Sequence, residues 1–122
     1  MAPSVLIVED NEILGELMCE ALAEHNQIAL VATSPREGLD LIERHPGLGI
    51  VLVDLRLKQE MDGLSLIKQV LSARPQTHCI LMTGLPPALT PELPPEVELL
   101  QKPFALAKLL EMVATRKDAG LV

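Results

Sequence analysis

Four short apolar runs in this sequence each lead into polar residues that could hold a phosphoryl group or a metal ion. In chain order, these polar residues are Glu9, Asp10, Asp54, Thr83 and Lys102. If the runs are parallel strands, their carboxyl ends open on one edge of a sheet, where open α/β folds bind ligands. Three carboxylates, one hydroxyl and one ammonium would then meet in one crevice. Such a set suits phosphoryl chemistry on a carboxylate.

The elements that must position these residues follow from two alternating hydrophobic patterns. Short runs rich in Val and Ile are followed by longer segments of helical period, which is typical of repeated βα units. We expect strands over 5–8, 28–32, 49–53, 79–82 and 97–100, and helices over about 11–25, 35–45, 63–74 and 104–116. The pattern predicts one α/β domain spanning residues 1–122, with a five-stranded parallel sheet.

Two of the expected helices have an apolar side that should face the sheet. In the first helix this side consists of Leu14, Leu17, Met18, Ala21 and Leu22. In the last helix it consists of Leu106, Leu109, Leu110 and Val113. Glutamates at positions 12, 16, 20 and 24 form an acidic stripe on the outside of the first helix, and such a stripe is more often a solvated face than a docking surface.

Capping residues mark the starts of two other helices. Ser34 can cap the second helix, Pro35 suits its first position, and Glu37 completes a capping box. The segment 61–63, Met-Asp-Gly, opens the third helix as a turn and has no part in the chemistry.

The connection over residues 85–95 holds five of the ten prolines of the chain. Proline removes a backbone donor and clashes with the preceding turn, so a long helix cannot form there. We expect an extended loop with at most one helical turn. Residues 118–122 at the other end of the chain are expected to form a frayed tail, which leaves a folded core of about 4–117.

Composition and charge narrow the range of partners. The 122 residues carry 10 basic and 17 acidic side chains, a formal charge of −7, and no basic block, so nucleic-acid binding is not expected. Cys19 and Cys79 have no metal or redox spacing and are expected to be reduced packing residues. With no signal peptide and no apolar run of about 20 residues, the expected location is cytoplasmic, without membrane contact.

Five short motifs occur in order along residues 5 to about 113. They are Val-Glu-Asp at 8–10, Asp-Leu-Arg-Leu at 54–57, Met-Asp-Gly at 61–63, Thr-Gly at 83–84 and Lys-Pro-Phe at 102–104. Taken singly, each has an ordinary explanation: Glu9 and Asp10, for example, could simply cap a helix. Together the motifs resemble those of the receiver domains of two-component and phosphorelay response regulators.

The resemblance implies a flavodoxin-like, doubly wound (βα)5 fold in which the fourth helix is short or is replaced by the Pro-rich loop. It implies that Asp54 is the phosphoacceptor. It also implies a Mg²⁺ site formed by Glu9, Asp10, Asp54 and the main-chain carbonyl of Arg56. Oxygen ligands of this kind suit the octahedral coordination of Mg²⁺.

By the same resemblance, Thr83 and Lys102 bind the phosphoryl oxygens through a hydroxyl and an ammonium. Receivers commonly have a cis bond before the proline that follows the lysine, and the sequence leaves the isomer of Lys102-Pro103 open. Typical receivers carry Tyr or Phe three residues before the lysine as part of the switch, whereas this chain has Leu99. The standard signalling surface therefore cannot be assumed.

Two further positions correspond to residues that tune the lifetime of the phosphorylated form in receivers, and these are Arg56 and Leu85. The implied function is to accept a phosphoryl group on Asp54 from a histidine kinase or histidine phosphotransfer protein and to switch a protein-interaction surface. No enzymatic activity is expected beyond phosphorylation and dephosphorylation of Asp54 itself. The resemblance does not identify the effector protein or say whether the chain forms a homodimer. It also leaves open whether the chain belongs with receivers attached to hybrid histidine kinases or with stand-alone regulators.

Two other classes of protein would use the same residues differently. A pseudo-receiver keeps the fold as a phosphorylation-independent interaction module; Leu99 and the Pro-rich loop favour it, whereas Asp10, Asp54 and Lys102 argue against it. A phosphohydrolase with an aspartyl nucleophile normally places a second Asp two residues later as general acid. That position is Arg56, which cannot release a proton near neutral pH.

Overall fold

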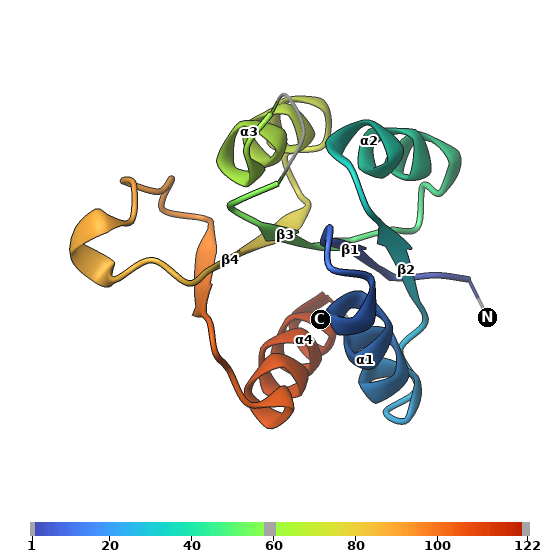
Figure 1. Cartoon of the computed structure of the whole chain (residues 1–122). Helices are drawn as coiled ribbons and strands as arrows, with labels where there is room; N and C mark the ends of the chain where they lie inside the picture. The colour runs from blue at the N-terminus through green and yellow to red at the C-terminus, as the bar shows by residue number, and fades with distance from the viewer. Residues whose placement is uncertain (1, 58–60, 121–122) are drawn as a thin grey trace.

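The computed structural model describes residues 2–57 and 61–120, which form three layers around one parallel sheet (Figure 1). The sheet has five strands in the order β2-β1-β3-β4-β5. The strands are β1 (Val5–Val8), β2 (Ala29–Ala32), β3 (Ile50–Asp54), β4 (His78–Thr83) and β5 (Glu98–Gln101). The strand order reverses between β1 and β3, so a crevice opens at the carboxyl ends of these two strands. The predicted flavodoxin-like sheet is confirmed.

Helices cover both faces of this sheet. Figure 1 shows α2 and α3 on one face and α1 and α4 on the other. The helices are α1 (Glu12–Ala23), α2 (Pro35–Arg44), α3 (Gly63–Ala73) and α4 (Leu106–Gly120). Between β4 and β5, the Pro-rich loop contains a single 3-10 turn, Pro87–Leu89, as expected from the prolines.

Alternate residues of the strands supply two separate cores, because successive side chains of a strand point to opposite faces. Val8, Val53 and Leu81 belong to the core under α2 and α3. Leu52 and Met82 belong to the core under α1 and α4. β3 is buried along its whole length, as predicted for a central strand covered on both sides.

Several element boundaries differ from the sequence prediction by one or more residues. β2 begins at Ala29, β4 extends from His78 to Thr83, and β5 includes Gln101. The last helix begins at Leu106 and continues to Gly120, so it includes residues 118–120, where a frayed tail was expected. Residues 121 and 122 lie outside the described residues. Polar residues at strand ends are missed because hydropathy alone does not report backbone pairing.

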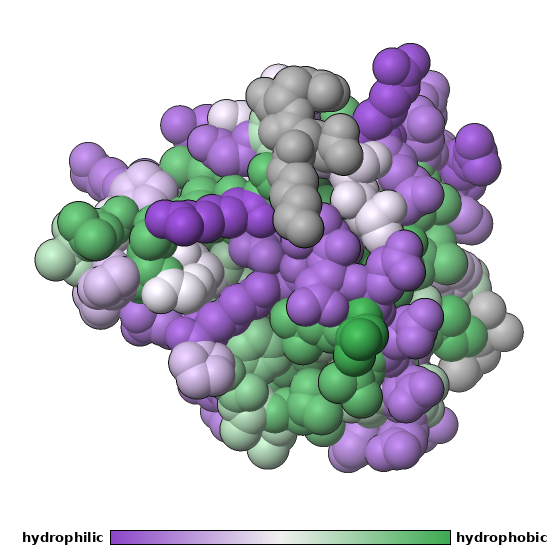
Figure 2. Space-filling model, viewed as in Figure 1, coloured by the Kyte–Doolittle hydropathy of each residue, from purple (hydrophilic) through white to green (hydrophobic). Residues whose placement is uncertain are grey.

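Two leucines predicted to face the sheet are exposed. Leu17 on α1 is 49% exposed and Leu106 on α4 is 39% exposed. Met18, Ala21 and Leu22 are buried as predicted, and Gly15, which the prediction left out, is buried with them because its small size lets α1 approach β2 closely. Figure 2 shows apolar surface over the region where Figure 1 places α1 and α4, and Ile13, 73% exposed, belongs to the exposed apolar residues of α1.

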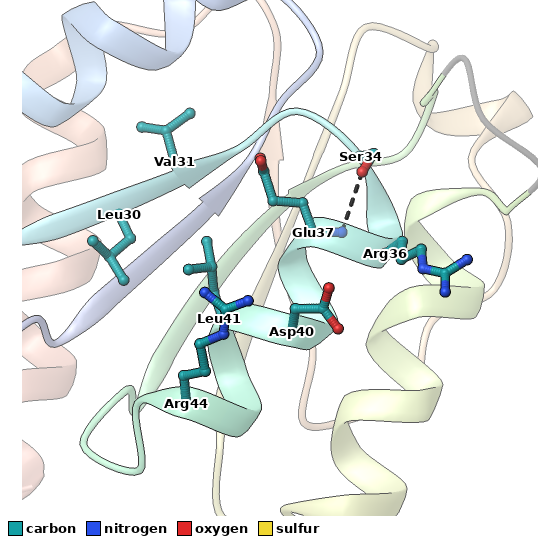
Figure 3. A pocket seen from close by; sticks show the side chains of 8 residues that line it. All are labelled: Leu30, Val31, Ser34, Arg36, Glu37, Asp40, Leu41 and Arg44. Carbon is teal, nitrogen blue, oxygen red and sulfur yellow. Dashed lines mark hydrogen bonds between the residues drawn. The ribbon is translucent and has the colours of Figure 1, made fainter.

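The predicted helix caps form, with one difference in detail. Ser34 Oγ accepts the Glu37 N–H at 3.2 Å (Figure 3). The carboxylate of Glu37 accepts the N–H of Thr33 at 2.7 Å, one residue earlier than in a standard capping box. Asp62 Oδ1 accepts the Ser65 N–H at 2.8 Å, as expected for a turn that starts α3.

Both cysteines are free thiols that pack within the fold. Burial raises the pKa of the Cys79 thiol to about 12, so it stays protonated near neutral pH. The Cys19 thiol donates to the carbonyl of Ala29 at 3.4 Å. None of the helices in the described part of the chain has the length and apolar character needed to cross a membrane.

A close backbone approach at the start of α3 predicts the effect of a single methyl group. A Cβ at Gly63 would lie 2.1 Å from the carbonyl oxygen of Asp54, and backbone cannot move away as a flexible side chain can. Gly63→Ala should lower the free energy of unfolding by about 3 kcal/mol, measured by urea denaturation. Gly49→Ala is the control, because a Cβ at Gly49 meets nothing within 4 Å. Equal stability of the two variants would contradict this account.

Candidate functional site

The predicted site residues are brought together by strand register. Val8 of β1 pairs with Val53 of β3, so Glu9 and Asp54, the next residues of the two segments, lie side by side. Thr83 is the last residue of β4, and Lys102 directly follows β5. All of these residues therefore lie at one edge of the sheet, as the sequence predicted from parallel strands.

The ammonium group of Lys102 connects two of the carboxylates. Its Nζ donates to Glu9 Oε1 at 2.6 Å and to Asp54 Oδ2 at 2.8 Å. The Glu9 side chain is 1% exposed, and the Asp54 and Lys102 side chains are 10% and 24% exposed. Because the pairs are largely shielded from water, each hydrogen bond is stronger than a surface ion pair of the same length.

Asp10 completes an acidic cluster with Glu9 and Asp54. One carboxylate oxygen from each residue can be chosen so that all three lie within 4.8 Å of one another. Oxygens that share one Mg²⁺ ion at about 2.1 Å lie within about 4.2 Å of each other, so small side-chain movements would suffice. The donor set therefore fits a hard divalent cation.

Backbone groups hold two of these carboxylates in place. The N–H of Asn11 donates to Glu9 Oε2 at 3.2 Å, and the N–H of Arg56 donates to Asp54 Oδ1 at 3.1 Å. Each carboxylate thus has one oxygen on backbone and one on Lys102. The orientation of the cluster is consequently set by the main chain as well as by the lysine.

Burial and charge act in opposite directions on the ionisable groups of the site. Burial raises the pKa of Glu9, and the hydrogen bond from Lys102 only partly offsets this effect. For Lys102, burial alone would lower the pKa, but hydrogen bonds to Asp54 and Glu9 outweigh it, so the pKa is raised. The ammonium therefore stays charged at neutral pH.

Thr83 is buried beside the site, but its hydroxyl is engaged with the following loop. Thr83 Oγ1 accepts the Leu85 N–H at 3.0 Å, and the Thr83 carbonyl accepts the Lys102 N–H at 2.7 Å. The hydroxyl proton can still be donated to another acceptor. The Lys102-Pro103 peptide bond, left open by the sequence, is cis.

Arg56 contacts the cluster through its main chain, whereas Leu99 lies outside it. The Arg56 side chain is exposed, and only its backbone N–H contacts Asp54. Leu99 is 37% exposed on β5, where the resemblance expected an aromatic switch residue. The three histidines, expected to be structural, lie outside the acidic cluster.

Sequence reasoning missed Gln101, because it ended the fifth strand at Leu100. Gln101 pairs with Thr83 in the sheet, and its Nε2 donates to the Leu85 carbonyl at 2.7 Å. The one feature of the sequence that could have drawn attention to Gln101 is its position directly before Lys102. A glutamine side chain at the end of an edge strand can bond a neighbouring loop, but the amino-acid sequence does not identify which loop it bonds.

Two of the grooves on the surface of the described residues differ in their relation to the site. One, of about 600 Å³, runs beside the acidic cluster and is lined by Leu14, Leu17, Gly84, Lys102, Pro103, Phe104 and Leu106. The other, of about 500 Å³, lies between α2 and β2, where Figure 3 shows Arg44 and Asp40 extending from the same helix. This second groove contains none of the predicted site residues.

Comparison with known proteins agrees with the family resemblance seen in the sequence motifs. Residues 5–114 match the family model of the response regulator receiver domain. The chain is 30% identical over 113 residues to the C4-dicarboxylate transport transcriptional regulatory protein DctD of Rhizobium meliloti. It is 27% identical over 82 residues to the transcriptional regulatory protein ComA of Bacillus subtilis. The matches cover 90% and 66% of this chain but only 24% and 38% of those relatives.

Solved structures share the fold. A CheY-like receiver domain protein from Methanospirillum hungatei superposes with a TM-score of 0.82 at 23% identity, covering 98% of this chain and 96% of that one. The signal receiver domain of a putative Luxo repressor protein from Vibrio parahaemolyticus gives 0.81 at 24% identity, covering 99% and 95%.

Removing the ammonium should destabilise the fold in a pH-dependent way. At about pH 8, Lys102→Met should cost about 2 kcal/mol in free energy of unfolding, because buried Glu9 and Asp54 lose their cation. The pKa of Glu9 is raised in the fold, so acidification protonates it and relieves the unpaired charge. Denaturation at about pH 5 should therefore show a smaller deficit.

The matched control for this substitution is Lys108→Met, which removes an exposed lysine of α4. Its effect on the free energy of unfolding should stay within about 0.5 kcal/mol at both pH values. A Lys102→Met deficit that grows on acidification would contradict the proposed pairing.

Proposed function

This chain belongs to the response regulator receiver domain family, and from that premise we propose that it accepts a phosphoryl group on Asp54. The donor would be a phosphohistidine of a histidine kinase or of a histidine phosphotransfer protein. The observation that carries this proposal is the Lys102 ammonium held between Glu9 and Asp54. A positive charge at that point can neutralise an anionic group arriving at Asp54.

The carboxylate of Asp54 is suited to act as the nucleophile. One of its oxygens would form a bond to phosphorus while the phosphorus–nitrogen bond of the phosphohistidine breaks, and the imidazole nitrogen keeps the electron pair and takes a proton from solvent. The backbone N–H of Arg56 restrains Oδ1, so the carboxylate is already oriented. Lys102 would then bind an oxygen of the transferred group.

A bound Mg²⁺ would neutralise charge on the phosphoryl group and the acidic cluster during transfer. The residues present fit the ion: Glu9, Asp10 and Asp54 supply three carboxylates against one ammonium, and their oxygens lie close enough together. Asp10 is the carboxylate of the three with no hydrogen bond to Lys102, which leaves it available as a ligand.

Thr83 would take part after the transfer. Its hydroxyl can donate a proton to a phosphoryl oxygen, and its position at the end of β4 links the site to the Pro-rich loop. By the family resemblance, Arg56 and Leu85 would set the lifetime of the phosphorylated form by controlling how water approaches Asp54. The chain would act on its own aspartate and not as an enzyme on other substrates, and it would pass the signal to a protein effector.

A pseudo-receiver remains the second candidate function, because Leu99 replaces the usual aromatic residue and the Pro-rich loop replaces a helix. The two functions make opposite predictions about ligand binding at the acidic cluster. A phosphorylation-independent module has no requirement for Mg²⁺ or for a phosphorylated Asp54.

Replacing the nucleophile tests the proposed reaction. Asp54→Asn should reduce phosphate incorporation from acetyl phosphate with Mg²⁺ to background, because an amide oxygen is a far weaker nucleophile than a carboxylate. Mass spectrometry of the intact protein would measure the added phosphoryl group. Asp40→Asn, an exposed aspartate of α2, should incorporate phosphate like the unmodified protein. Undiminished labelling of Asp54→Asn would sink the assignment.

Metal binding can be tested separately from phosphorylation. We expect Mg²⁺ to bind in the millimolar range and Asp10→Asn to weaken it about tenfold, since a charged ligand is lost. Amide shifts of Asn11 and Arg56 in a two-dimensional NMR titration would report binding. Glu12→Gln, in the exposed first turn of α1, is the control and should keep the affinity unchanged. No response of the unmodified protein would favour the pseudo-receiver.

A further inference from the structure

Two hydrogen bonds join the start of the Pro-rich loop to the ends of neighbouring strands. The N–H of Leu85 donates to Thr83 Oγ1 at 3.0 Å, and the Leu85 carbonyl accepts from Gln101 Nε2 at 2.7 Å. The two partners are the last residues of β4 and β5, and they are paired in the sheet. Leu85 is thus clamped from both sides by neighbouring strand ends.

The side chains of the two clamping residues lie on the same face of the sheet. Residues of adjacent strands that pair in register point to the same side, so Thr83 and Gln101 both point toward α3, together with Leu81 and Leu99 of the same strands. Leu99 occupies the place where a larger side chain would otherwise lie, and it is partly exposed. Gln101, one pair closer to the site, is the residue of β5 that contacts the loop.

The rest of the loop has little capacity to hold itself to the sheet. Five of its eleven residues are prolines without an N–H donor. Leu89 N–H and Thr90 N–H both bond to carbonyls within the loop, on Pro86 and Pro87. Leu85 and Leu93 pack against the core under α2 and α3, so the two leucines and the Leu85 clamp hold the loop down.

We propose that Gln101 is a latch that holds the Pro-rich loop closed, and that engagement of the Thr83 hydroxyl by a phosphoryl group on Asp54 opens it. The second half of this proposal rests on the proposed function. Thr83 Oγ1 is buried and presently accepts the Leu85 N–H. A change of the Thr83 χ1 angle that carries Oγ1 to a phosphoryl oxygen would remove the acceptor of the Leu85 N–H, and the Gln101 bond alone would no longer hold the loop closed.

This arrangement places the switch at position 101 and not at position 99. Because Gln101 bonds the loop directly, the switch would not need an aromatic side chain at position 99 that changes rotamer. A leucine can therefore occupy that position. The Pro-rich loop is the element that changes, and its release uncovers the apolar contacts of Leu85 and Leu93 with the core. The loop and the surface beneath it would then form the output face.

Removing the latch tests the first half without any ligand. Gln101→Leu keeps the size of an exposed side chain and removes its donor. In the unmodified and variant proteins, hydrogen exchange of the Leu85 amide and ¹⁵N order parameters of residues 88–90 would be measured. In Gln101→Leu, we expect Leu85 exchange to rise about fivefold and the order parameters to fall toward about 0.6. Unchanged values would overturn the latch.

Thr90→Val is the matched control, because it removes a hydrogen bond from Thr90 Oγ1 to Pro86 within the loop and leaves the Leu85 clamp intact. Leu85 exchange should stay within about twofold of the unmodified protein. A fivefold rise in this control would show that loop ordering in general, and not the Gln101 bond, protects Leu85.

The coupling to the site is tested by adding Mg²⁺ and beryllofluoride, a phosphoryl mimic. Leu85 exchange should rise about fivefold in the unmodified protein and still further in Gln101→Leu, where neither bond to Leu85 would be left. Binding at Asp54, seen as a shift of the Arg56 amide, without a loop response would overturn the release step alone. If beryllofluoride does not bind, both the proposed function and the opening of the loop by a phosphoryl group are contradicted. The comparison of Gln101→Leu with the unmodified protein without ligand would still test whether Gln101 holds the loop.

Discussion

The ammonium of Lys102 is the group on which the arrangement of the site depends. Glu9 and Asp54 lie beside each other because β1 and β3 are adjacent, and two ionised carboxylates at such a distance repel one another. Hydrogen bonds of 2.6 and 2.8 Å from one nitrogen offset that repulsion. Segments far apart in the sequence are thereby tied together where they leave the sheet. Because one ammonium faces three carboxylates, a divalent cation entering the crevice meets an excess of negative charge.

The end of β3 is braced by backbone contacts on several sides. The N–H of Leu55 donates to the Met82 carbonyl at 2.8 Å, and the Leu55 carbonyl accepts the Gly63 N–H, also at 2.8 Å. Gly63 packs directly against the carbonyl of Asp54, where a side chain would clash. The Met-Asp-Gly turn, expected only to start a helix, therefore also fixes the position of the nucleophile proposed here. Such rigidity suits a group that must be presented in one orientation.

The half of the molecule that would carry output departs from the family pattern more than the half that carries the acidic cluster. Helices cover both faces of the sheet near β1 and β3, whereas the connection between β4 and β5 is a Pro-rich loop with one 3-10 turn. Leu99 and Gln101 point from β5 toward the side of this loop. Similar folds host different functions. The acidic cluster therefore supports a proposal about the chemistry of the site, whereas the Pro-rich loop does not identify the partner protein.

The sequence by itself determined the class of the fold and the residues of the cluster. Alternating βα hydropathy and the polar residues after each apolar run predicted a parallel sheet with Glu9, Asp10, Asp54 and Lys102 at one edge, because strand direction alone brings such ends together. The family roles of these residues remain predictions. Only the tertiary structure decided that Gly15 is buried and Leu17 exposed on α1, where β5 ends, and that Gln101 holds Leu85. These features depend on contacts between distant segments, which local periodicity does not report.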